Sequence, residues 1–379
     1  MIVRQFLYWV RTAAAGERAD ATSALARALL YSDLSADDRI AAEGALLMLL
    51  DDPSPLVRRS MAEALAASPD APPAVILALA ADQPEIAGIV LERSPLLLDA
   101  DLVDSVGAGD TATQSAIARR RDLPRAVAAA IAEVGTAEAC LTLLANDSAE
   151  IPPFSLDRIV ARHGQLAAIR ENLLAREDLP TSTRQTILVR LAETLAEFVA
   201  DRVWLDERRA RRVAKEACEK ATIALAAASP TTEVRPLVSH LRESGQLSSG
   251  LILRALLSGN VRLFEEALAE LSGMPVARVA ALVHDRRAAA FQALYTKAGL
   301  PASAYSAFRA ALDAMHEVGF VAELGGVAKL KRRMVERVLT RCEREDPEEA
   351  GPLLLLLRRF ATEAARDEAR LLCNELVAA

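Results

Sequence analysis

Around residue 50 the pattern of apolar and polar positions changes from one helix to the next. An apolar helical segment ends at Leu50, and the turn Asp52-Pro53 follows because a residue before proline disfavours helix. We expect the Ser54 hydroxyl to cap a second helix that starts at Pro55, where the missing N–H costs nothing. The segment is therefore predicted to be one helical hairpin.

The second helix is amphipathic. Four apolar residues fall on one face at i, i+4, i+7 and i+8, namely Val57, Met61, Ala64 and Leu65. The residues expected toward the other side are Arg58, Arg59, Ala62 and Glu63. Two such helices cannot bury their apolar stripes alone, so the hairpin needs neighbours of the same kind.

The pattern of an apolar helix end followed by an acidic turn recurs along the first half of the chain. The turn residues are Asp52, Asp82, Asp110 and Asp147, at spacings of 30, 28 and 37 residues. A second turn signal, which ends in Pro95, Pro124 and Pro180, alternates with the first. The repetition predicts an all-α fold: an α-solenoid of helical hairpins, followed by a C-terminal helical region.

Three regions are expected from the pattern. Residues 1–200 form an N-terminal helical cap and repeat array, in which Ile2–Val10 is the first helix. Residues 201–230 form a connecting region, mostly one long charged helix over 201–228, and residues 231–379 form an all-helical region packed on the array.

Shorter helices are predicted in the C-terminal region, over residues 233–243, 248–257, 260–271, 275–284 and 286–298. Gly273 and Gly299 suit left-handed helix ends, and aromatic residues from 291 to 308 are expected to pack in a core. The last helix carries an apolar stripe, Leu354, Leu357, Ala361, Ala364 and Leu371. It either packs on its own chain or makes a homodimer.

Composition supports a helical interior built from small side chains. The 379 residues are 52% hydrophobic but only 4% aromatic. Residues 1–150 carry 12 arginines, no lysine and 22 acidic residues, so this half is strongly acidic. That balance disfavours nucleic acid as a partner, because phosphate binding needs clustered positive charge. Four scattered cysteines favour a cytoplasmic protein, and no apolar segment is long enough to span a membrane.

No catalytic constellation is recognisable. The four histidines, His163, His240, His284 and His316, lack the spacing of metal ligands, and neither a phosphate-binding loop nor a nucleophile elbow is present. We therefore predict no catalytic, cofactor-binding or metal-binding residues. Enzymatic activity stays open, but the sequence favours a non-enzymatic role.

Two resemblances extend this interpretation. The pattern Asp-Pro-x-x-Leu-Val-Arg from Asp52 through Pro53 to Arg58 resembles the turn of HEAT repeats. This implies that Asp52 and Arg58 take part in a bonded ladder between adjacent repeats. The segments Tyr31–Leu34, Ser68–Pro72, Leu91–Pro95 and Ala293–Arg309 also resemble an uncharacterised alphaproteobacterial family of unknown function with HEAT-like character. That resemblance implies a bacterial cytosolic α-solenoid and transfers no active site.

The leading hypothesis is a protein–protein interaction scaffold, in bacterial signalling for example, that binds an acidic or phosphorylated partner. The candidate partner-binding residues are Arg58, Arg59, Arg93, Arg119, Arg120 and Arg121. Their alternative role is ion pairing with neighbouring Asp and Glu. Two other functions stay open: nucleic-acid binding or DNA repair on a HEAT-like scaffold, and a small-molecule lyase or ligand carrier such as the bilin lyases.

Overall fold

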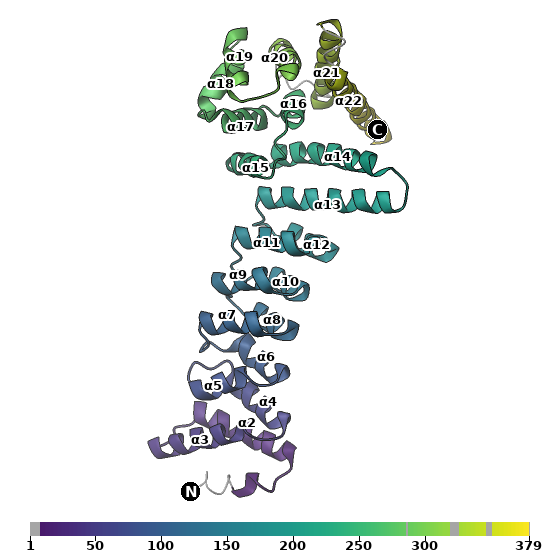
Figure 1. Cartoon of the computed structure of the whole chain (residues 1–379). Coiled ribbons are helices and arrows are strands. Elements are labelled where there is room, and N and C mark those ends of the chain that lie inside the picture. Colours follow the sequence, from purple (N-terminus) through teal and green to yellow (C-terminus); the bar gives the residue numbers. More distant parts are fainter. Residues whose placement is uncertain (1–7, 286, 319–325, 346–350, 379) are drawn as a thin grey trace. The chain divides into compact units, whose positions relative to one another are not determined.

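A computed structural model of the chain describes residues 8–285, 287–318, 326–345 and 351–378. The chain is 77% helical, and no strand occurs among the residues described. The prediction of an all-α helical repeat fold is thus confirmed (Figure 1). The expected first helix over Ile2–Val10 lies mostly outside the described residues, which begin with a helical turn at residue 8.

The contacts between residues divide the chain into two compact units, Met1–Leu179 and Pro180–Ala379. Unit 2 has a hydrophobic core of its own, whose buried residues run from Ile223 to Phe360. The three-part division expected from the sequence, with boundaries at residues 200 and 230, stays a prediction about domains.

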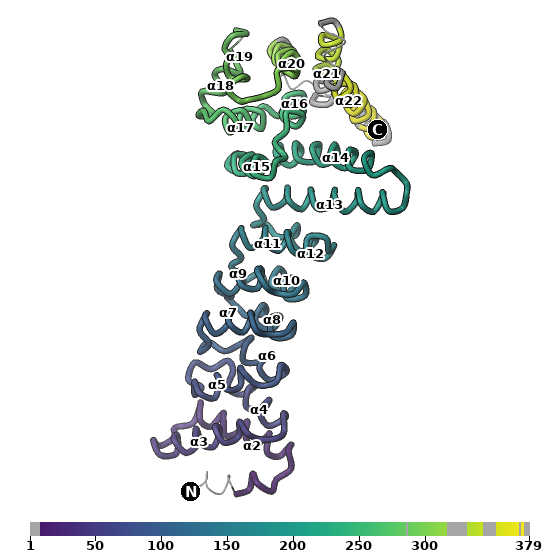
Figure 2. Tube along the Cα trace, viewed as in Figure 1, coloured from purple at the N-terminus to yellow at the C-terminus, as the bar shows by residue number. Residues whose placement is uncertain are grey.

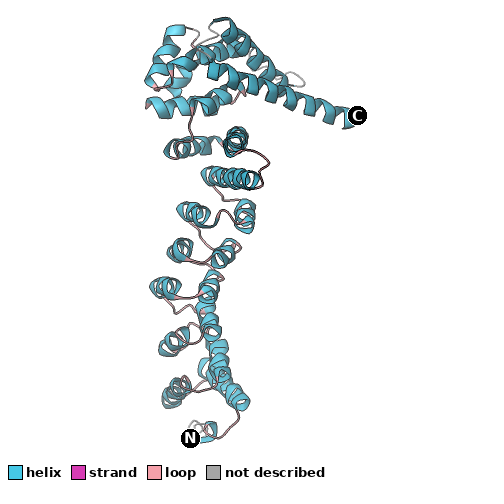
Figure 3. Cartoon of the chain, turned by 45° about the vertical axis from the view of Figure 1, so that its right-hand side comes forward, coloured by secondary structure: helices cyan, strands magenta, loops and turns pink. Residues whose placement is uncertain are grey.

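Unit 1 is an array of paired helices whose chain passes back and forth between two layers (Figures 2 and 3). One layer contains α2 (Ala15–Tyr31), α4 (Pro55–Leu65), α6 (Pro84–Arg93), α8 (Thr111–Ala118), α10 (Ala137–Leu144) and α12 (Ala167–Ala175). The other layer contains α3 (Ala36–Leu49), α5 (Pro73–Ala80), α7 (Asp99–Ala108), α9 (Arg125–Val134) and α11 (Pro153–His163). Helices pack on their neighbours in the same layer, as α6 does on α4 and α8 and as α9 does on α7 and α11.

Local sequence explains where these helices begin. Ser35 accepts a hydrogen bond from the Asp38 amide at 3.2 Å, and Asp110 and Thr136 cap α8 and α10 in the same way. The predicted cap at Ser54 is wrong, because its hydroxyl makes no capping bond. The Ser54 N–H instead donates to the Asp52 carboxylate at 2.8 Å, a local bond that shapes the turn ahead of the helix.

The buried face of α4 is broader than the sequence pattern predicted. Val57, Met61 and Leu65 are fully buried as expected. Ala62, expected on the polar side, is also fully buried, whereas Ala64 is only half-buried. The reason is that α4 packs on α2 on one side and on α6 on the other. A single apolar stripe is too narrow to make both contacts. Small side chains make this two-sided contact achievable.

Unit 2 begins with a hairpin of two long helices, α13 (Thr181–Asp201) and α14 (Glu207–Ala228). The single helix predicted over 201–228 is wrong at its start: the chain turns at residues 202–206, and Asp206 caps α14 by accepting from the Arg209 amide at 2.9 Å. The helices that follow are α15 (Thr231–Glu243), α16 (Ser249–Leu257), α17 (Val261–Ser272), α18 (Val276–His284), α19 (Ala288–Lys297), α20 (Tyr305–Val318), α21 (Gly326–Glu345) and α22 (Gly351–Ala378).

The core of unit 2 contains the expected aromatic cluster. Phe264 and Phe308 stack with ring centroids 6.2 Å apart, and Tyr295 packs edge-on against Phe308 at 5.4 Å. The Tyr295 hydroxyl donates to the Pro301 carbonyl at 2.6 Å, and burial raises the pKa of this phenol to about 12. Gly273 and Gly299 have φ values of +66° and +68°, the left-handed geometry predicted for these two helix ends.

The apolar stripe of α22 is largely covered by its own chain. Leu354, Leu357 and Ala364 are buried, and α22 packs mainly on α21. The Leu371 side chain lies outside the described residues. Of the two roles left open for this stripe, packing within the chain is what the described residues show.

Candidate functional site

Asp52 and Arg58 belong to a chain of ion pairs that links successive helix pairs of unit 1. Arg18 on α2 donates two hydrogen bonds to the Asp52 carboxylate, both at 2.8 Å. Arg58 on α4 donates two to the Asp82 carboxylate at 2.6 and 3.0 Å, and a third to the Asp52 carbonyl at 2.6 Å. These bidentate pairs connect each turn with a helix of the neighbouring pair.

The surroundings of these carboxylates shift their titration. The hydrogen bond from Arg18 holds the pKa of Asp52 below its usual value, in spite of burial. Burial acts to raise the pKa of Asp82, but the hydrogen bonds from Arg58 and the Gln83 amide outweigh it and lower that pKa. Both aspartates are therefore ionised at neutral pH and held in structural bonds.

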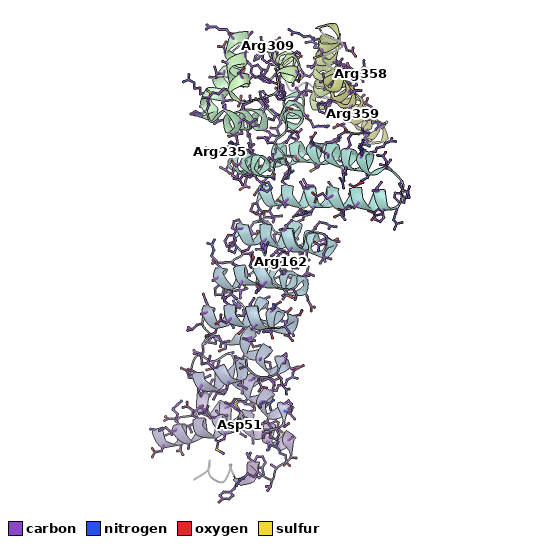
Figure 4. All side chains as sticks on the ribbon, viewed as in Figure 1. Asp51, Arg162, Arg235, Arg309, Arg358 and Arg359 are labelled. Atoms are coloured by element: carbon purple, nitrogen blue, oxygen red, sulfur yellow. The ribbon has the colours of Figure 1, made fainter. Side chains whose placement is uncertain are left out.

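Arg120 points into the array. Its guanidinium donates to the carbonyls of Leu91 and Ser94, at the C-terminal end of α6. Arg162 on α11 makes the equivalent contacts in the other layer, with the carbonyls of Ala132 and Gly135 at the end of α9, both at 2.8 Å (Figure 4). In each case one acceptor is the carbonyl of the residue just after the helix. The other is the carbonyl of the residue three positions earlier in the chain. Arginines thus satisfy helix-end carbonyls and complement the helix dipole.

The six arginines expected to bind a partner therefore separate into two kinds. The guanidinium groups of Arg58 and Arg120 donate their hydrogen bonds to groups inside the array. These two side chains therefore do not add to an exposed arginine surface. The other four have side chains that are more than half exposed: Arg59, Arg93, Arg119 and Arg121. Arg59 pairs with Glu63, and Arg93 and Arg119 both lie near Glu92. Binding of a partner by these four residues stays a prediction.

A large cavity lies in unit 2, along the α13–α14 hairpin. It has a volume of about 920 Å³ and is bounded by both helices and by the connection between α15 and α16. We call it the hairpin groove. Its lining from α13 runs from Gln185 to Asp201, and its lining from α14 runs from Glu207 to Thr222.

A buried polar network forms the inner end of the hairpin groove. The Thr222 hydroxyl donates to the Gln185 side-chain oxygen at 2.9 Å, and the Gln185 amide donates to the Gln246 side-chain oxygen at 2.9 Å. Gln185 and Thr222 are both almost fully buried, and Cys218 lies beside them. Burial raises the pKa of the Cys218 thiol, so it is a poor nucleophile at neutral pH.

The rim of the hairpin groove is acidic. Six carboxylates line the groove: Glu193, Glu197, Asp201, Asp206, Glu207 and Glu219. The cations in the lining are Arg211, which pairs with Glu207, and Lys215. Burial raises the pKa of Glu219, which lies 3.7 Å from the Nε atom of the buried Arg254. The groove therefore presents a negative potential to an approaching molecule.

The hairpin turn next to this groove exposes a small aromatic cluster. Phe198 and Trp204 pack edge-to-face with centroids 5.9 Å apart, and the Arg202 guanidinium lies 4.3 Å from the Phe198 ring centre. Val203 has a φ of +58°, which is rare for a β-branched residue. This residue is also 86% exposed, so the turn combines an unusual backbone conformation with an apolar residue in solvent.

A buried arginine fixes α22 to the side of the hairpin. Arg254 on α16 is 4% exposed, pairs with Glu363 on α22, and stacks on Phe360 with its guanidinium 4.1 Å from the ring centre. Arg359 pairs with Glu216 on α14 at 2.6 Å, and Figure 4 marks its position on α22. These contacts involve the described parts of α14, α16 and α22.

The described residues carry neither a metal cluster nor a membrane span. None of the histidine, cysteine and carboxylate side chains in that part of the chain group together as a metal site. Within the same ranges, every helix is too short or too polar to cross a bilayer.

Residues 86–347 match the sequence profile of a bacterial family described as "Uncharacterised protein conserved in bacteria (DUF2336)". The chain belongs to this family. A comparison with curated proteins gives no match. The DUF2336 match confirms the resemblance to an uncharacterised bacterial family. It begins within α6, so it includes Arg120 and the hairpin groove and leaves out Asp52 and Arg58.

Proposed function

We propose that this DUF2336 protein is a non-enzymatic interaction scaffold that binds partner proteins on the surfaces of its helix pairs. The observation that carries the proposal is the bonding between repeats. Arg58 joins its own turn to Asp82, and Arg120 and Arg162 close the ends of earlier helices. Polar residues that would otherwise be candidates for chemistry are used to hold successive pairs in register, which favours an extended binding surface.

The bonding also supports a HEAT-like description of unit 1. The turn aspartate and the following arginine bond across successive helix pairs, as the resemblance implied for Asp52 and Arg58. Repeat arrays of this kind bind along continuous surfaces formed by several pairs. The acidic rim of the hairpin groove works against the nucleic-acid alternative, because carboxylates repel a phosphate backbone.

Quantitative affinity capture from a bacterial lysate tests the scaffold role. The immobilised wild type is compared with an array variant, Arg119→Ala/Arg121→Ala, and with a groove variant, Glu193→Gln/Glu197→Gln. We expect wild type to retain specific proteins, and one variant to lose a protein that then binds purified wild type directly in calorimetry. If the bare resin and all three proteins retain the same material, the scaffold role is wrong.

A further inference from the structure

The hairpin groove has the dimensions of a site for a helix. The part of α13 that lines it, residues 185–201, is about 24 Å long at 1.5 Å per residue. Its walls include Val189, Ala192, Ala196, Ala200 and Ala214. Such small side chains let another helix approach closely, since the distance between packed helices depends on the side chains at the contact.

Three carboxylates of the groove form a row along one wall. Glu193, Glu197 and Asp201 follow each other at four-residue intervals on α13, so they share a face and lie about 6 Å apart along the axis. Glu193 forms an exposed ion pair with Arg190 at 3.1 Å. Because exposed ion pairs contribute little free energy, Glu193 can exchange this partner for a cation of a bound helix at little cost. A helix with lysine or arginine at the same intervals matches this row of carboxylates.

The hairpin turn is a separate indication of a binding site. Val203 and Leu205 line the hairpin groove at its outer end, and Val203 is the residue with a φ of +58°. Strained backbone of this kind is concentrated at ligand clamps and other functional sites. Trp204 beside it is 65% exposed, and tryptophan is enriched among residues that dominate binding energy at protein interfaces.

We propose that the hairpin groove binds an amphipathic helix of a partner protein, one that carries lysine or arginine every fourth residue along the flank facing α13. Its small apolar residues pack on the alanines of the groove, and its cations pair with Glu193, Glu197 and Asp201. This inference rests on the proposed scaffold function and gives it a partner of defined chemistry. That partner is basic, whereas the exposed arginines of unit 1 point to an acidic one.

Binding of a designed peptide to the full chain tests the inference. The probe is a fluorescently labelled helical peptide of about four turns, with alanine and leucine on one face and lysine every fourth residue on one flank. A second peptide has glutamate in place of each lysine. We expect the lysine peptide to bind more tightly, and Glu193→Gln/Glu197→Gln to weaken it roughly three- to twentyfold in anisotropy titrations. Added salt should reduce this difference.

Two further variants make the result specific. Glu171→Gln/Glu177→Gln removes two exposed carboxylates outside the groove and should bind the lysine peptide as wild type does. Ala200→Trp fills the groove without changing its charge and should abolish binding, with helical content checked by circular dichroism. Equal affinity for the two peptides, or unchanged binding by the groove variant, would overturn the inference.

The peptide result and the capture result are distinguishable. If the lysine peptide fails to bind while the array variant loses a partner in the lysate experiment, the scaffold role stands and the groove is not its basic-helix site. If the peptide binds through the groove but wild type retains no protein in the lysate, the groove chemistry is right and the scaffold role is wrong.

Discussion

Arg58 and Asp82 form a bidentate ion pair although they are 24 residues apart in the chain. The remaining hydrogen-bond contact of the Arg58 guanidinium reaches the carbonyl of Asp52, so one side chain holds two successive turns. Both partners are mostly buried, with side-chain exposures of 12% and 13%. The pair is therefore far less exposed to solvent than an ordinary surface ion pair.

Removing Arg58 should destabilise unit 1. Arg58→Ala leaves the Asp82 carboxylate and the Asp52 carbonyl without their main donors, and we expect a loss of about 2–4 kcal/mol in the free energy of unfolding. Urea unfolding followed by circular dichroism measures it. The neighbouring Arg59→Ala is the control, since Arg59 makes only an exposed pair with Glu63 and should cost less than about 0.5 kcal/mol. Equal effects would contradict the structural role of Arg58.

Acid should weaken the same region. Asp52 and Asp82 have folded-state pKa values below the usual 3.8, so their contribution to stability is present above that value. It is lost as the pH falls from about 4 through the folded-state pKa values. Hydrogen exchange measured by mass spectrometry should show faster opening of residues 52–82 below pH 4. Asp52→Asn/Asp82→Asn should be less stable at pH 7 and should show a weaker pH dependence; an unchanged dependence would count against the ion pairs.

Arg120 and Arg121 should behave differently although they are adjacent. Arg120→Ala removes the donor to the Leu91 and Ser94 carbonyls and should lower stability by about 1–3 kcal/mol. Arg121 is 93% exposed, and its alanine variant should stay within about 0.5 kcal/mol of wild type. Thermal unfolding of both variants decides the matter. A larger effect at Arg121 would show that the orientation of Arg120 is wrong.

Relief of strain at Val203 should stabilise the hairpin. Asparagine tolerates a φ of +58° better than a β-branched residue, so Val203→Asn should raise stability by about 1 kcal/mol. Val213→Asn is the matched control: Val213 is also exposed, but it lies within α14, where the substitution should give no gain. Urea unfolding of unit 2 within the full chain compares them. A gain of the same size at both positions would point to reduced surface hydrophobicity instead of backbone strain.

The sequence predicted the helices of unit 2 closely where glycine and proline end them. The predicted helices over 248–257 and 275–284 differ from α16 and α18 by one residue at the start. The turn at residues 202–206 was missed because Trp204 and Leu205 continue the apolar pattern across it. Asp206 followed by Glu207 was a readable helix-start signal, since aspartate is a favoured cap and acidic residues suit the first turn.

The candidate site was harder to foresee than the fold. Arg119, Arg120 and Arg121 look alike as a charge run, and only the packing of α8 on α6 turns the second one inward. A usable signal exists in the spacing: Arg120 and Arg162 lie 29 and 30 residues after the first carbonyl that each contacts. The hairpin groove left no comparable signal, because its lining combines α13, α14 and the α15–α16 connection, which no local pattern brings together.

The arginine bonds at helix ends also fix an order of events during synthesis. The carbonyls of Leu91 and Ser94 meet their donor only when Arg120 has been added, and those of Ala132 and Gly135 wait for Arg162. At these two positions a growing chain therefore carries a helix end whose carbonyls lack their side-chain donor until a later helix has been made.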